Sequence, residues 1–226
     1  MTGYPWLWFT VLLAGCSILP EPKPVHYRYL VLEAMTPMPG PPRAAGTTVE
    51  LRGVELPSYI DVDAVVTRVD ANEIGFSHDE LWGEPLATAL PRILALDLGS
   101  RLAADGVDLE PAGSQADASI DVMIRRFERG TAGRAEVWAR WSVRDRARRG
   151  DITRGEVHLV DEEGRPVAIG LSRLLGKLGD AIAADVRDRS LNFAAGALGG
   201  AHRADASATE HPGALGRAAL SRRTSR

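Results

Sequence analysis

Hydrophobic and polar residues recur along this chain with two different periods, and the period of each segment predicts a strand or a helix. The clearest period-two alternation runs over residues 134–144, where small or apolar residues alternate with Glu, Trp, Arg and Ser. Such alternation places one set of side chains on each face of a strand. Shorter runs of the same kind predict strands at 27–33, 47–56, 65–69, 73–77, 118–127 and 155–160.

Two segments instead have the three- and four-residue spacing of an amphipathic helix. The first lies between residues 79 and 105 and begins near Pro85, since proline is tolerated in a first helical turn. Pro91 falls inside this segment, and we expect a kink or a restart there because proline removes a backbone hydrogen bond and clashes with the preceding turn. The second helix is predicted over residues 171–186.

This order of elements predicts a single α+β domain, an antiparallel-rich mixed sheet with two main helices packed on one face. We divide the chain into a signal peptide (1–15), a lipidated cysteine with a proline-rich tether (16–26), the α+β domain (27–188) and a basic tail (189–226). The tail carries six arginines against two acidic residues and is rich in Ala, Gly and Ser, so we expect it to be disordered and solvated. Contact of the tail with anionic lipid or an acidic partner is the alternative.

The only cysteine of the chain, Cys16, ends the tetrad Leu13-Ala14-Gly15-Cys16 after a short apolar run. This pattern is typical of a bacterial lipoprotein signal, in which small residues admit the signal peptidase and the cysteine thiol receives a diacylglycerol. The apolar run is too short to span a bilayer as a helix. An ordinary buried cysteine is the alternative interpretation, and the absence of Lys and Arg before the run departs from the usual signal.

The lipid on Cys16, with acyl chains such as palmitate, would hold the domain permanently at a membrane. Ser17 stands where an inner-membrane retention signal would place Asp. By resemblance to sorted lipoproteins, this favours a lipid-anchored location at the outer membrane, facing the periplasm.

Residues that could carry chemistry are scattered rather than grouped. The five histidines form no HxxxH spacing and a single cysteine forms no CxxC pair, so we expect no metal site. There is no GxSxG motif and no glycine-rich phosphate loop. Acidic residues interleave the arginines of residues 125–154, which argues against a nucleic-acid partner. We therefore expect neither an enzyme nor a cofactor, apart from the covalent lipid on Cys16.

Three segments carry a resemblance to a known family. Residues 54–61 (VELPSYID), followed by VVTR at 65–68, are similar to an "lP.ylDrp.ivtR" stretch, and LWGEPL at 81–86 is similar to a "W.epL" helix start. Residues 172–183 match the final helix of the family in character. The chain thus resembles the PqiC/YmbA-like ABC-type transport auxiliary lipoproteins, although Val62 and Asp63 replace the usual Arg-Pro.

The resemblance implies an accessory subunit of an MCE-containing ABC-type system that transports lipids or hydrophobic solutes between membranes and supports membrane integrity. It also implies docking to the MCE-domain component and self-association into a ring. Tyr59, Trp82 and Trp138 are our interface candidates, because aromatic residues often anchor interfaces. Packing within the fold is the alternative for Tyr59 and Trp82. A stand-alone lipoprotein that binds a hydrophobic ligand in its own cavity is the alternative function.

Overall fold

The structure is a computed structural model that describes residues 25–35, 46–146 and 152–207; for residues 190–207 it describes the backbone alone. The predicted lipoprotein signal, including Leu13, Ala14, Gly15 and Cys16, lies outside the described residues.

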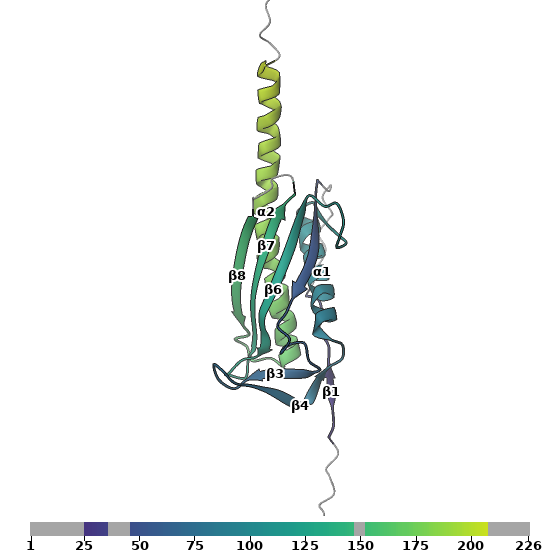
Figure 1. The fold of residues 1–226 in the computed structure, drawn as a ribbon, viewed down its shortest axis with the longest axis vertical. Helices are drawn as coiled ribbons and strands as arrows, with labels where there is room; N and C mark the ends of the chain where they lie inside the picture. The colour runs from purple at the N-terminus through teal and green to yellow at the C-terminus, as the bar shows by residue number, and fades with distance from the viewer. Residues whose placement is uncertain (1–24, 36–45, 147–151, 208–226) are drawn as a thin grey trace, which may run out of the picture.

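Eight strands form one mixed sheet, and two helices pack against it (Figure 1). The strands are β1 (Arg28–Leu30), β2 (Thr47–Glu55), β3 (Ala64–Arg68), β4 (Ile74–Trp82), β5 (Val107–Glu110), β6 (Ala118–Arg129), β7 (Ala135–Asp145) and β8 (Ile152–Val160). The helices are α1 (Leu86–Ala104) and α2 (Val167–Ser207). The predicted α+β class, with a mixed sheet and two main helices, is confirmed.

Strand β6 pairs with three other strands of the sheet. It pairs with β7 in antiparallel fashion along its whole length, and on its other side with β2 and then with the end of β3, both in parallel. Strand β8 extends the sheet beyond β7, and β5 extends it beyond β2. The short β1 pairs in parallel with β4, which forms the predicted hairpin with β3. The longest pairings are the antiparallel ones, as the strong alternation in residues 134–144 predicts.

Both helices lie on one face of the long strands (Figure 1). Helix α1 packs on β2 and β5, and α2 packs on β6, β7 and β8. The interior is apolar, and burial of each large side chain contributes about 1.5–3 kcal/mol relative to exposure. The fully buried residues include Leu90, Leu94, Leu98, Ile120, Ile124, Val137, Leu171, Leu175 and Leu178. The described helices include none that is long and apolar enough to cross a bilayer.

The first helix begins where it is predicted to begin, since α1 starts at Leu86, directly after Pro85. Trp82 continues the apolar helical spacing toward the N-terminus, but it lies at the end of strand β4 and outside the helix. Pro91 lies within α1, but the helix runs to Ala104 without a restart. The apolar residues around Pro91, among them Leu90 and Leu94, are buried and hold the helix in place.

The second helix is longer than predicted. It continues to Ser207 and projects past the end of the sheet (Figure 1). The expectation of disorder from residue 189 is therefore wrong for 189–207, where several alanines favour a helix. Residues 208–226 of the expected tail lie outside the described residues.

Candidate functional site

The sheet face opposite the helices carries charged and aromatic side chains from β2, β6, β7 and β8, and we call it the open face. Its main members are Arg52, Met123, Arg125, Trp138, Arg140, Arg144 and Glu156. They occupy alternate strand positions, because the intervening residues point into the core under the helices.

Trp138 lies at the centre of one part of the open face. The register of β6 on β7 shifts between Ile124 and Arg126, a bulge that leaves two consecutive arginines on the same side. The guanidinium carbons of Arg125 and Arg126 lie 5.0 and 5.4 Å from the Trp138 ring centroid, within cation–π range. The half-buried indole is thus held in a fixed orientation.

Glu156 on β8 completes this arrangement. It accepts a 2.7 Å hydrogen bond from the Trp138 indole N–H and lies 2.9 Å from Nε of Arg140. The hydrogen bonds from Arg140 and then from Trp138 lower the pKa of Glu156. The carboxylate is therefore charged at neutral pH, and the open face presents ordered groups of both signs.

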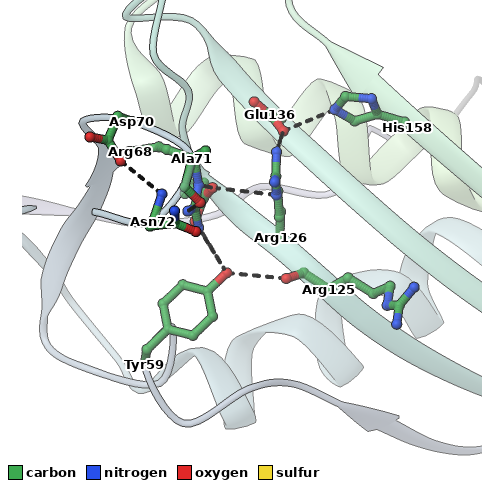
Figure 2. Close-up of polar contacts among 10 residues, drawn as sticks. Tyr59, Arg68, Asp70, Ala71, Asn72, Arg125, Arg126, Glu136 and His158 are labelled. Atoms are coloured by element: carbon green, nitrogen blue, oxygen red, sulfur yellow. Dashed lines mark hydrogen bonds and ion pairs between the residues drawn. The ribbon is translucent and has the colours of Figure 1, made fainter. Parts of the chain in front are cut away.

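A second carboxylate, Glu136, shares Arg126 with this cluster. It accepts a 2.8 Å hydrogen bond from Arg126 and contacts Nε2 of His158 at 2.9 Å (Figure 2). Burial acts to raise its pKa, but the hydrogen bonds from Arg126 and His158 outweigh burial, so the pKa of Glu136 lies below its ordinary value. Glu136 thus ties β6, β7 and β8 together at the edge of the Trp138 cluster.

Tyr59 and Arg68 meet at the buried carboxylate of Glu128. Arg68 donates to both Glu128 oxygens, at 2.5 and 3.1 Å, and the Tyr59 hydroxyl donates to the Arg125 carbonyl at 3.1 Å. Burial, followed by the charge of Glu128, raises the pKa of Tyr59. Tyr59 therefore fastens its loop to β6, and its hydroxyl is engaged within the fold.

Trp82 is not available as an interface residue. It is 7% exposed, and its ring centroid lies 6.3 Å from that of Phe127 in the core. The alternative prediction of core packing describes it correctly, although it lies on β4 and not in a helix. Of the three aromatic candidates, Trp138 alone belongs to the open face.

Asp61, two residues after Tyr59, caps the start of helix α1, a role that the sequence did not indicate. Its Oδ1 accepts a 3.1 Å hydrogen bond from the backbone N–H of Ala87 in the first turn of α1. Pro85, at the cap position itself, makes no side-chain cap, so a residue distant in sequence supplies one. The segment 57–61 thus positions both the start of α1 and the end of β6.

A groove of about 820 Å³ runs along the open face beside Trp138. Asp121 lies between Arg52 and Arg144, 3.6 Å from each Nε, while Met123 is 46% exposed. Paired charges around an exposed thioether resemble the polar and apolar mixture of a protein–protein interface. Within the described ranges, no three His, Cys, Asp or Glu side chains gather closely enough to hold a metal ion.

Comparisons with solved structures show the same fold in other proteins. A protein from Xanthomonas campestris superposes with a TM-score of 0.55 at 14% identity, covering 74% of this chain and 98% of its own. A second, uncharacterized protein gives a TM-score of 0.53 at 17% identity, covering 73% and 97%. PelC from Paraburkholderia phytofirmans, crystallised as a dodecamer, is more distant, with a TM-score of 0.36 at 15% identity over 62% of this chain and 88% of its own.

No curated protein matches this chain. The sequence profile described as "ABC-type transport auxiliary lipoprotein component" matches residues 30–183, which include every strand from β2 to β8, helix α1 and the packed part of α2. That description is of a transport component and not of an enzyme. The chain belongs to the ABC-type transport auxiliary lipoprotein family.

Proposed function

We propose that this chain is a periplasmic accessory lipoprotein, anchored in the outer membrane by lipid on Cys16, that docks through its open face to the MCE-domain component of an ABC-type transport system. Its role is non-enzymatic: it supports membrane integrity by holding the end of a conduit for lipids or hydrophobic solutes at the membrane. Self-association into a ring is part of this proposal, as the family resemblance implies.

The observation that carries the docking proposal is the uncovered open face with Trp138 at its centre. Its indole is held by Arg125, Arg126 and Glu156, so little side-chain freedom remains to be lost on binding. Fixed Trp and Arg side chains are the residue types that contribute most to binding energy at interfaces. Membership of a transport auxiliary family supports a partner within an ABC-type transport system, and the resemblance of the sequence motifs suggests its MCE-domain component.

The alternative, a hydrophobic ligand inside the domain, finds less support. The side chains between the sheet and the helices are close to fully buried against one another, and the large groove lies on the open face. Charged residues line that groove, whereas a pocket for a hydrophobic ligand is lined mainly by apolar groups.

The test is co-purification of the tagged full chain from mildly solubilised membranes. We expect the MCE-domain component to co-purify with wild type, and the amount recovered with Trp138→Ala to be lower by about tenfold or more. Leu96→Ala, at a 52% exposed position on α1, is the matched control and should behave as wild type. Equal retention by all three proteins would refute docking through the open face, and absence of the component from all three would refute the docking itself.

A further inference from the structure

Strand β1 and its flanking residues expose an unusual set of side chains. Val25, Tyr27, Tyr29 and Val31 occupy every second position and are 55%, 55%, 68% and 55% exposed. Side chains at alternate positions of an extended segment share one face. These four residues therefore form a continuous row, which we call the apolar stripe.

The other face of this segment packs on the protein at Leu30 and Leu32, whereas His26 and Arg28 on the same face are exposed. Leu32 is buried, Leu30 is half-buried, and Arg28 donates a 2.7 Å hydrogen bond to Glu80 on β4. A strand with one covered face normally places polar residues on the other. Here the exposed face is more apolar than the covered one, and the packing of the domain does not account for that.

Other exposed apolar residues lie at the same end of the molecule. Among the described residues, nine large hydrophobic side chains are exposed, and six belong to the apolar stripe or to the β3–β4 hairpin, where Val69 and Phe76 are 56% and 49% exposed. Figure 1 shows β1, β3 and β4 together at one end, with the projecting part of α2 at the other. The clustering indicates a surface that contacts an apolar or amphipathic partner.

The position of the stripe in the chain indicates which partner. Val25 follows Cys16 by nine residues, and an extended chain advances at most about 3.3–3.6 Å per residue. The stripe therefore begins within about 30 Å of the cysteine. Prolines at alternate positions from Pro20 to Pro24 favour an extended path between them.

We propose that the apolar stripe rests on the surface of the lipid bilayer that holds the acyl chains of Cys16. This inference rests on the lipid anchor of the proposed function. The Tyr27 and Tyr29 rings would lie at the level of the lipid head groups, where an apolar ring and a polar hydroxyl both find suitable surroundings. A second contact of this kind fixes the orientation of the domain, because tethering alone leaves it free to rotate.

The lipidated full chain, reconstituted in phospholipid vesicles with brominated acyl chains, provides the test. Because the thiol of Cys16 is consumed by the lipid, Tyr29→Cys introduces the only free thiol, to which an environment-sensitive fluorophore is attached. Leu96→Cys on α1, 52% exposed in wild type, carries the same fluorophore as the control. We expect bromine to quench the label at position 29 by about twofold or more and to leave the label at position 96 unchanged.

Flotation of the vesicles separates this inference from the anchor on which it rests. If the labelled proteins float and position 29 is not quenched, the stripe does not touch the bilayer, while the anchor stands. Labels at position 29 could instead quench one another, and adding unlabelled protein would then relieve that quenching. This result would show that the stripe contacts a second copy of the chain, and it would overturn the inference. Proteins that fail to float would overturn the anchor and the inference together.

Discussion

At the scale of the residue, the buried charges of this domain are held by partners from distant segments. Glu128 is fully buried and is met by Arg68 and Tyr59, about sixty residues earlier in the chain. Burial of a charge is costly unless it is paired and hydrogen-bonded. The resemblance picked out Tyr59 and Arg68, but no local pattern marks Glu128 as their partner, so the sequence could not predict this contact.

Glu128→Gln should destabilise the domain strongly. The change leaves Arg68, whose side chain is 12% exposed, without its counter-charge, and breaking a buried pair typically costs about 3–5 kcal/mol. Glu162→Gln is the matched control, because Glu162 forms a surface pair with Arg134 and its removal should cost less than about 1 kcal/mol. Urea unfolding of both variants measures the difference, and equal losses would contradict this role for Glu128.

Glu136 should make the stability of the domain depend on acid pH. Its pKa is lower in the folded state than in the unfolded chain, so its contribution is complete above the unfolded value and is lost as the pH falls through the folded one. We expect the stability gap between wild type and Glu136→Gln to be wide at pH 7 and to narrow toward about pH 3. Urea midpoints across that range test this, and a constant gap would exclude the linkage.

At the scale of the element, the long strands and the packed parts of both helices could be predicted because each has one buried face with a regular period. The four-residue β5 is too short to show a period, so the sequence pattern does not predict it. The second half of β4 could not be predicted, because Trp82 at its end continues the helical spacing of the residues after it. The bulge in β6, which places two arginines beside Trp138, leaves no mark in the sequence pattern.

Gly155 in β8 packs directly against the ring of Trp141 on the adjacent strand β7. A Cβ placed on Gly155 would lie 2.1 Å from the Trp141 ring, whose indole N–H donates to Asp185 on α2 at 2.7 Å. Gly155→Ala should therefore displace the ring and cost about 1–3 kcal/mol. Gly53→Ala in β2, where nothing lies within 4 Å, is the control. Denaturant unfolding with near-ultraviolet circular dichroism reports both effects, and a Gly155→Ala protein as stable as wild type would rule out this packing.

Helix α1 should lose stability without its distant cap. Asp61→Ala removes the acceptor for the Ala87 N–H and should cost about 1 kcal/mol. Asp63→Ala should cost less, since Asp63 is exposed and its backbone carbonyl, which the substitution keeps, is the acceptor for Trp82 N–H. Thermal unfolding of the two variants compares them, and the reverse order would contradict the capping role.

At the scale of the whole molecule, the fold has one covered and one open sheet face, with the apolar stripe at one end. The sequence predicted Trp138 on a polar strand face, and the structure places it there beside the groove. It could not predict the apolar stripe, because residues 27–33 have the apolar character of an ordinary buried strand. Which face of residues 27–33 stays exposed depends on how β1 packs on β4.

Site-specific photo-crosslinking in the native membrane tests the central claim, docking through the open face, most directly. A photoreactive residue replaces Met123 on the open face or, as the control, Leu96 on α1; the two side chains are 46% and 52% exposed. We expect the MCE-domain component to be crosslinked from position 123 and not from position 96. Crosslinking from position 96 alone, or from neither position while the two proteins co-purify, would contradict docking at the open face.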